Sequence, residues 1–289
     1  MKLVNQIVLL SCVCLYACGG EEKDVSKLME GDDKISQLTP QDLSALGDKT
    51  IYFGHQSVGT NIMDGVEDLL KEHKKLPLKI IETSDAGAIE EGHFAHSKVG
   101  KNHDPDSKFN EFEEFMNNGI GKKVDVAFLK LCYVDIHTKT DLEKTFEKYK
   151  QSYNRIKQKY PDTTFVHLTV PVTADYSGVK GVVKEAKNVA KELLGKPNKY
   201  DNSVKTKYNE LIRKEYAGKE PLFDIAKVES TYPNGERRLV KNNESLVPQY
   251  TDDGNHLDAQ GRKIVAEELL LFLSKLDKEK QATDSTAAK

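Results

Sequence analysis

Residues 51–59 have the sequence Ile51-Tyr52-Phe53-Gly54-His55-Gln56-Ser57-Val58-Gly59, an apolar run that passes into small and polar residues. The pattern predicts a strand over Ile51–Gly54 and a helix over Gly59–Glu72. Ser57 then lies at a strand-to-helix turn, where its hydroxyl is accessible and the N–H groups of the helix start can face an oxyanion. A serine here can equally be only a helix cap, so this segment alone leaves both roles open.

On both sides of this segment, apolar strand-like runs alternate with helical patterns, which is typical of a parallel sheet with helices on both faces. The predicted strands are Ile51–Gly54, Leu78–Glu82, Val124–Leu131, Thr164–Val170 and Leu222–Ile225. The predicted helices are Gly59–Glu72, Lys108–Met116, Asp141–Lys159, Val204–Tyr216 and Ala259–Leu276. The sequence therefore predicts an α/β fold, a three-layer α/β/α sandwich of flavodoxin-like type with a mainly parallel sheet of about five strands.

A second motif stands just before the last predicted helix, in the stretch Tyr250-Thr251-Asp252-Asp253-Gly254-Asn255-His256-Leu257-Asp258. Asp253 precedes His256 by three residues in a loop that contains glycine. This spacing lets the carboxylate reach the imidazole N–H, fix its tautomer and stabilise the imidazolium that forms when it takes a serine proton. Together with Ser57, the motif supplies a nucleophile, a base and a group that orients the base, which favours catalysis over capping.

These two motifs resemble the SGNH/GDSL hydrolase family, whose nucleophile follows the first strand and whose Asp-x-x-His precedes the last helix. The resemblance covers residues 49–276, with Ser57, Asp253 and His256 at the catalytic positions. The family usually has Gly-Asp-Ser at the nucleophile, whereas this chain has Gly-His-Gln-Ser. The resemblance is therefore to a divergent branch of the family.

The oxyanion hole is where the sequence departs most from this family. The resemblance implies three donors: the serine N–H, a glycine after the second strand, and an asparagine after the third. Val134 occupies the position of that asparagine. We expect Gly100 and Asn102 to supply the missing donors, with Gly87 as a competing backbone donor. The alternative is that residues 96–105 form an ordinary polar loop shaped by glycine and proline.

Other polar residues near these motifs are candidates for contact with substrate. They are His55, Gln56, His96 and Asp135. His93, His96 and His103, with Asp104, could suggest a metal site, but their spacing matches no zinc pattern, and we expect neither a metal nor a cofactor.

The N-terminus predicts export. Residues 1–18 have one early lysine, an apolar run too short to span a membrane comfortably, and a small residue before Cys18. This pattern resembles a bacterial lipoprotein signal in which Cys18 carries the lipid. Residues 19–48 are predicted to be a polar tether, residues 49–276 the hydrolase domain, and residues 277–289 a disordered tail. We expect a monomer in the bacterial cell envelope, held to the membrane only by its lipid anchor and facing the periplasm or the cell surface.

Composition narrows the set of partners. The 43 basic and 46 acidic residues are spread along the chain and give a net charge of -3, so no continuous basic face is available for nucleic acid. Without its first 17 residues the chain keeps only Cys18 and Cys132 as cysteines, which excludes a disulfide framework. Cys132 follows an apolar run and is expected to be a buried structural thiol.

The leading hypothesis is a serine esterase that removes short acyl groups, acetyl above all, from glycans or related esters. The envelope address and the family resemblance favour this substrate class by analogy. Two alternatives stay open: a catalytically silent domain that binds surface glycans, and a glycan O-acyltransferase.

Overall fold

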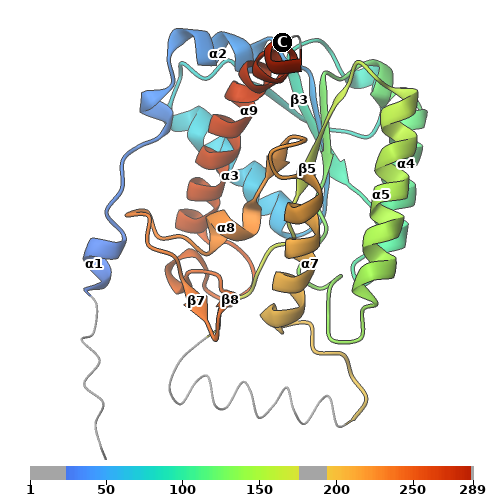
Figure 1. Ribbon diagram of the computed structural model, residues 1–289. Coiled ribbons are helices and arrows are strands. Elements are labelled where there is room, and N and C mark those ends of the chain that lie inside the picture. The colour runs from blue at the N-terminus through green and yellow to red at the C-terminus, as the bar shows by residue number, and fades with distance from the viewer. Residues whose placement is uncertain (1–23, 176–193, 288–289) are drawn as a thin grey trace, which may run out of the picture.

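The computed structural model describes residues 24–175 and 194–287 (Figure 1). Within them the central sheet has six strands in the order β2-β3-β1-β4-β5-β6, and every neighbouring pair is parallel. The strands are β1 (Ile51–His55), β2 (Lys79–Glu82), β3 (His93–Lys98), β4 (Val126–Leu129), β5 (Thr164–Leu168) and β6 (Leu222–Phe223). A separate antiparallel hairpin consists of β7 (Leu239–Val240) and β8 (Asn243–Glu244).

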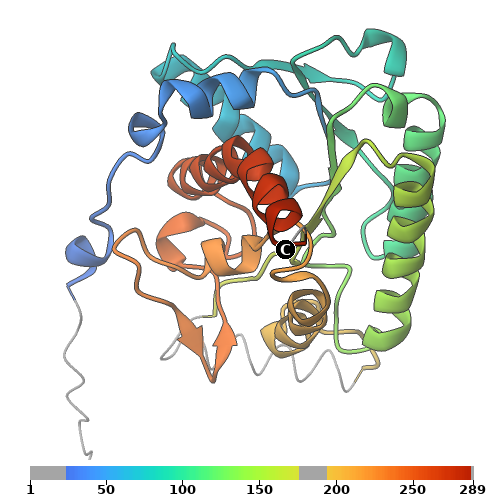
Figure 2. The ribbon, with the colours of Figure 1, turned by 45° about the horizontal axis from the view of Figure 1, so that its top comes forward.

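Helices cover both faces of the sheet (Figures 1 and 2). The α-helices are α1 (Val25–Leu28), α2 (Pro40–Gly47), α3 (Val58–Glu72), α4 (Pro105–Asn117), α5 (Leu142–Lys159), α7 (Asn202–Tyr216), α8 (Ile225–Glu229) and α9 (Ala259–Ala287). Four short 3-10 helices are η1 (Ile35–Gln37), η2 (Ala86–Ala88), η3 (Ile120–Lys122) and η4 (Pro248–Tyr250). One layer contains α2, α3, α8 and α9, and the other contains α4, α5 and α7. The predicted three-layer α/β/α class is confirmed.

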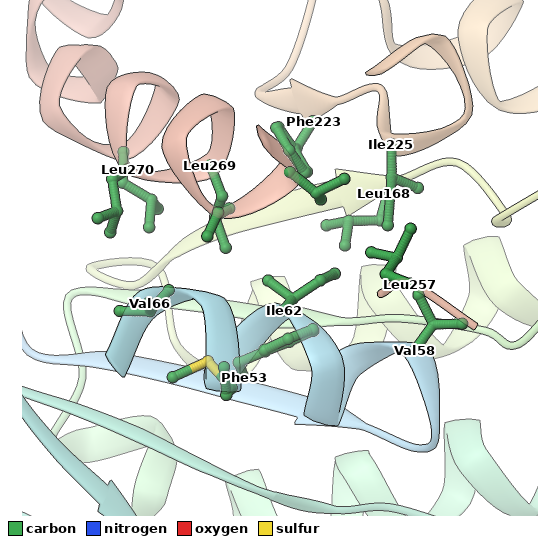
Figure 3. Close-up of a cluster of buried hydrophobic side chains, with 14 of the residues drawn as sticks. Phe53, Val58, Ile62, Val66, Leu168, Phe223, Ile225, Leu257, Leu269 and Leu270 are labelled. Carbon is green, nitrogen blue, oxygen red and sulfur yellow. The ribbon is translucent and has the colours of Figure 1, made fainter. Parts of the chain in front are cut away.

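Each layer has its own apolar core against the sheet. Figure 3 shows the core between α3, α9 and the strands, where side chains from distant parts of the chain meet. Its labelled members are Phe53, Val58, Ile62, Val66, Leu168, Phe223, Ile225, Leu257, Leu269 and Leu270. Among these residues, Phe53 comes from β1, the strand that ends next to Ser57, and Val58 begins α3 just after it. Packing on both sides of Ser57 therefore fixes the turn that carries it.

Strand β3 is absent from the sequence prediction, which placed His96 in a loop. The strand pairs with β2 on one side and β1 on the other. Its residues from Phe94 to Ser97 are buried, although a histidine and a serine interrupt the apolar run. The sheet therefore has six strands instead of about five, and the loops after β3 and β4 flank the end of β1.

The two predicted ends of the domain also need correction. Leu28, Ile35, Leu38 and Leu46 are buried in the core beside α3 and α9, so residues 24–48 are part of the domain and not a tether. Helix α9 continues past residue 276 to Ala287, where the sequence predicts a tail. The signal segment, Cys18 and residues 19–23 lie outside the described residues. No helix in the part of the chain that the structure describes is long and apolar enough to cross a membrane.

Buried Glu229, at the end of α8, makes the stability of the fold depend on pH. Its carboxylate accepts a hydrogen bond from Val172 N at 2.8 Å. Burial raises the pKa of Glu229 from 4.5 to about 8, against the opposing effects of the Val172 N–H and Lys130. The unfolded chain loses this proton near pH 4.5, whereas the folded chain keeps it to about pH 8. The contribution of Glu229 to stability is therefore complete below the lower value and is lost as the pH rises between the two.

We expect Glu229→Gln, which keeps the shape and an acceptor for Val172 N, to remove this pH dependence. Between pH 5 and pH 8 the unsubstituted protein should lose up to about 1.4 kcal/mol of unfolding free energy per pH unit from this group. Urea unfolding at a series of pH values measures the slope. Equal slopes in the two proteins would show that Glu229 does not titrate in this window.

Candidate active site

Ser57 lies at a sharp turn between β1 and α3. Its backbone has φ 48° and ψ -102°, a conformation that non-glycine residues seldom adopt. Ser57 is the N-cap residue of α3, but its side chain makes no capping hydrogen bond. The capping role that the sequence left open is therefore wrong, and the hydroxyl faces the second motif.

Gly59 allows α3 to begin directly above β1. A Cβ at Gly59 would lie 2.3 Å from the Cβ of His55, a distance at which two carbon atoms collide. The His55 side chain therefore lies beneath the first turn of α3 and supports the Ser57 turn from inside. Any larger residue at position 59 would push the turn away from the sheet.

The structure brings Ser57, His256 and Asp253 into one hydrogen-bonded line. His256 Nε2 lies 2.6 Å from Ser57 Oγ, and His256 Nδ1 lies 2.7 Å from Asp253 Oδ2. The other carboxylate oxygen of Asp253 accepts the N–H groups of Asn255 at 2.7 Å and of His256 at 2.8 Å. The Asp-x-x-His loop thus closes on its own carboxylate, which holds the imidazole toward the serine.

The charge of Asp253 fixes the tautomer of His256. Partial burial acts to raise the pKa of Asp253, but hydrogen bonds from the His256 ring and from two backbone N–H groups outweigh it and lower the pKa to about 2. An ionised carboxylate only accepts hydrogen bonds, so Nδ1 carries the proton and Nε2 is free to accept from the Ser57 hydroxyl. This is the arrangement that a general base requires.

The site is shallow, and one aromatic side chain lies against it. The His256 side chain is 44% exposed and that of Asp253 is 51% exposed. The Tyr133 ring meets His256 edge to face, with ring centroids 5.8 Å apart and planes at 77°. Sequence reasoning missed Tyr133, although its place just after β4, beside the end of β1, is the signal that could have identified it.

Backbone donors for an oxyanion are available at the start of α3. Among residues 24–175 and 194–287, no acceptor binds the N–H of Ser57 or of Val58. Both groups belong to the turn that presents the Ser57 hydroxyl. Their position fits the oxyanion-binding role of a helix N-terminus.

The three donors that the sequence suggested have different outcomes. The prediction for Gly87 is wrong, because its N–H donates to the Asp85 carboxylate at 2.8 Å in η2. The N–H of Gly100 donates to the Glu111 carboxylate, so it is occupied. Asn102 accepts a hydrogen bond from Lys108 Nζ at its Oδ1 atom, which leaves its amide nitrogen as the remaining candidate.

Three of the four candidates for the substrate pocket, His55, His96 and Asp135, are buried inside the protein. Asp135 is buried in an ion pair with Lys108, so it does not line a pocket. His55 is 1% exposed and its Nε2 lies 3.0 Å from Nδ1 of His96, which is also buried. Burial, with smaller effects of His96 and Lys130, lowers the pKa of His55 to about 2, so it stays neutral.

Gln56 is the one pocket candidate that is only half-buried, and it ties the nucleophile turn to its neighbours. Its Nε2 donates to the carbonyl of Gly100 at 2.9 Å. The backbone carbonyl of Gln56 accepts a hydrogen bond from the Cys132 thiol at 3.6 Å. Cys132 is a free, buried thiol, in keeping with the structural role expected for it. No group of His, Cys, Asp or Glu side chains in the described ranges could hold a metal ion.

Neither a family model nor a curated protein sequence matches the chain. Solved structures give matches at low identity. A Streptococcus pneumonia protein provisionally described as a platelet activating factor is 13% identical with a TM-score of 0.47, over 86% of this chain and 96% of that one. A Parabacteroides merdae protein provisionally described as a GDSL-like lipase is 14% identical with a TM-score of 0.46, over 78% and 95%. A catalytic mutant of an acetylxylan esterase from Geobacillus stearothermophilus is 11% identical with a TM-score of 0.40, over 78% and 94%.

Proposed function

We propose that this protein is a serine esterase in which Ser57 is the nucleophile, His256 the general base and Asp253 the group that orients it. The observation that carries the proposal is the continuous line of contacts, 2.6 Å from serine to histidine and 2.7 Å from histidine to aspartate. The strained backbone of Ser57 and its unused capping capacity support the same role. A serine kept only for structure would have no need of either feature.

The reaction follows from this geometry. His256 Nε2 takes the Ser57 proton as Oγ forms a bond to the acyl carbon of the ester, and the carbonyl oxygen becomes an oxyanion. As the ester bond breaks, the imidazolium gives its proton to the leaving alcohol, and the acyl group stays on Ser57. Water, deprotonated by His256, then attacks the acyl-enzyme and releases the acid and the free serine. All of these steps use groups of the chain and water.

We assign the oxyanion to the N–H groups of Ser57 and Val58 and to the side-chain amide of Asn102. Gln56 links the nucleophile turn to Gly100, two residues before Asn102, so the loop after β3 adjoins the serine. The amide would take the place of the asparagine that Val134 replaces. Each such donor contributes about two to three orders of magnitude in related acyl-transfer sites.

The proposed substrates are short acyl esters of glycans, with acetyl as the main group. The support is the resemblance of the two sequence motifs to SGNH/GDSL hydrolases and the predicted export of the chain. The shallow site also suits an ester that projects from a large molecule. Acetate released from aryl acetates and from acetylated polysaccharides measures this activity.

The same assay separates the alternatives. Acetyl transfer to an added oligosaccharide, with little free acetate, would favour an O-acyltransferase. Glycan binding without release of acid from any of these esters would favour the silent binding domain and overturn the esterase proposal.

We also propose that Cys18 is the mature N-terminus and carries lipid, which would place the domain on a membrane surface of the bacterial envelope. The support is the apolar run before Ala17-Cys18-Gly19. Intact-mass analysis of protein extracted from membranes should give a chain that begins at Cys18 with acyl groups attached. An unmodified Cys18, or a different first residue, would refute the anchor.

A further inference from the structure

Lys108 is a buried cation near the start of α4, the helix that follows the loop after β3. Its side chain and that of Asp135 are both 0% exposed and form an ion pair. Lys108 Nζ also donates to Asn102 Oδ1 at 3.1 Å. Burying a charged pair away from water costs free energy unless its remaining polar atoms are also hydrogen-bonded. Here Lys108 bonds to Asn102, in the loop after β3.

Asp135 connects the two loops that flank Ser57. It accepts from His103 N at 2.8 Å, in the loop after β3, and from Cys132 N at 2.7 Å, in the loop after β4. Because β3 and β4 are the two neighbours of β1 in the sheet, these loops lie on either side of the strand that ends next to Ser57. The ion pair therefore connects the loops after β3 and β4 to Lys108 in α4.

The loop after β3 is also fitted closely over Lys108. Gly100 has φ +64°, and a Cβ there would lie 2.6 Å from the backbone nitrogen of Lys108. His103 has φ 69°, a second left-handed residue in the same loop. Along this tight path Asn102 Oδ1 comes within 3.1 Å of the Lys108 ammonium group.

This contact sets the direction of the Asn102 amide. An ammonium group has three donors and no acceptor, so it can only face the amide oxygen. The amide nitrogen must then point away from Lys108. The positive charge also polarises the amide, which strengthens its N–H groups as donors.

We propose that Lys108 is a positioning residue that holds the Asn102 amide, through its oxygen, in the orientation that donates to the oxyanion. The inference rests on the proposed function, because it concerns the same reaction. Asp135 neutralises Lys108 and fixes both loops, and Asn102 is the group that touches the substrate oxygen. The chain thus replaces the asparagine missing at Val134 with an asparagine on the other side of Ser57 and a buried lysine to orient it.

The test uses variants that remove the lysine without leaving a buried carboxylate unpaired. Lys108→Met alone would leave Asp135 uncompensated and is expected to unfold readily. The double variant Lys108→Met/Asp135→Asn removes both charges, and the new amide oxygen keeps an acceptor for one of the two backbone N–H groups. It is compared with Asn102→Ala and with the triple variant, all in the full chain, and circular dichroism verifies the fold.

Two readouts separate positioning from a structural role. One is the rate at which a fluorophosphonate probe phosphonylates Ser57, a step in which Oγ bonds to phosphorus and fluoride leaves. The other is kcat and KM for an aryl acetate. In the double variant we expect both the labelling rate and kcat to fall about tenfold or more, with KM changed less than twofold, because the lost interaction forms only in the transition state. In the triple variant we expect no further fall beyond that of Asn102→Ala.

Lys157→Met is the control, because it breaks another lysine-carboxylate pair, a partly exposed one with Glu220, which precedes the edge strand β6. Its labelling rate should equal that of the unsubstituted protein. A folded double variant that labels and turns over at the normal rate would overturn the inference alone, and so would independent, additive losses in the triple variant. Absence of Ser57 labelling in the unsubstituted protein would overturn the proposed function and the inference with it.

Discussion

Ser57→Ala is expected to lower the turnover of an aryl acetate by about three orders of magnitude or more. The substitution removes the oxygen proposed to bond to the acyl carbon, and the remaining activity would come from oxyanion donors acting on bound substrate and water. The hydroxyl makes no capping hydrogen bond, so its loss should leave the fold and its melting temperature almost unchanged. Rates are measured with circular dichroism as the check on folding.

His256→Ala should cause a loss of similar size, since the serine keeps its proton without the base. The variant lacking both side chains should be little worse than either single variant, because the two act as one unit. Asp253→Ala should cost less, because a poorly oriented imidazole can still act as a base.

Ser36→Ala provides the matched serine control, because the Ser36 hydroxyl donates to the nearby carbonyl of Asp33 at 2.7 Å. Its turnover should equal that of the unsubstituted protein. If Ser57→Ala retained normal turnover across aryl acetates and acetylated polysaccharides, Ser57 would not be the nucleophile. If the unsubstituted protein turned over these esters no faster than Ser57→Ala does, because neither released acid, the catalytically silent glycan-binding alternative would be favoured.

A chain that begins at Lys49 is expected to lose its cooperative fold. The deletion removes the buried side chains of Leu28, Ile35, Leu38 and Leu46 from the core beside α3 and α9. Each such side chain contributes about 1.5–3 kcal/mol, so the four together amount to about 6–12 kcal/mol. The net stability of a domain is about 5–15 kcal/mol, so little would remain. Thermal unfolding followed by circular dichroism measures the effect.

The control for this experiment is a chain that begins at Asp24, which keeps every described contact and should melt cooperatively. Leu46→Ala in that longer chain should lower the unfolding free energy by about 2–5 kcal/mol. A chain from Lys49 that melted within a few degrees of the chain from Asp24 would show that residues 24–48 are dispensable, as a tether would be.

The sheet could be predicted where strands are continuous apolar runs, as in β1 and β4. Strand β3 could not, because His96 and Ser97 give it a polar composition while their partners bury them. His96 pairs with His55, and the Ser97 hydroxyl lies 2.7 Å from that of Tyr52. Both partners are on β1, more than forty positions earlier, so their pairing is invisible to local periodicity.

The order of residues 24–48 could not be predicted for a different reason. Its apolar residues are few and irregularly spaced, and acidic and basic residues surround them, so its composition is that of a polar linker. What makes residues 24–48 ordered is the apolar surface of α3 and α9 that they cover. That surface exists only once the remainder of the chain has folded.

In the candidate site too, contacts between nearby residues could be predicted from the sequence, whereas contacts between distant residues could not. The Asp253–His256 pair could be predicted because its contact spans three residues and depends on local loop geometry. The Lys108–Asp135 pair spans 27 positions and joins a helix to a strand end, so sequence reasoning gave Asp135 a place in the pocket. Contacts of this length depend on the order of the strands, which the sequence pattern did not determine.

The exposure of His256 and Asp253 affects the size of the molecules that can reach Ser57. The side chain of His256, the proposed base, is 44% exposed and lies at the protein surface. A polymer can therefore bring an ester on its outer side to Ser57 while its own chain passes across the protein, without any free end being threaded through. Selection among esters would then depend on the small acyl part that enters beside Tyr133, and the length of the polymer would have little influence on the rate.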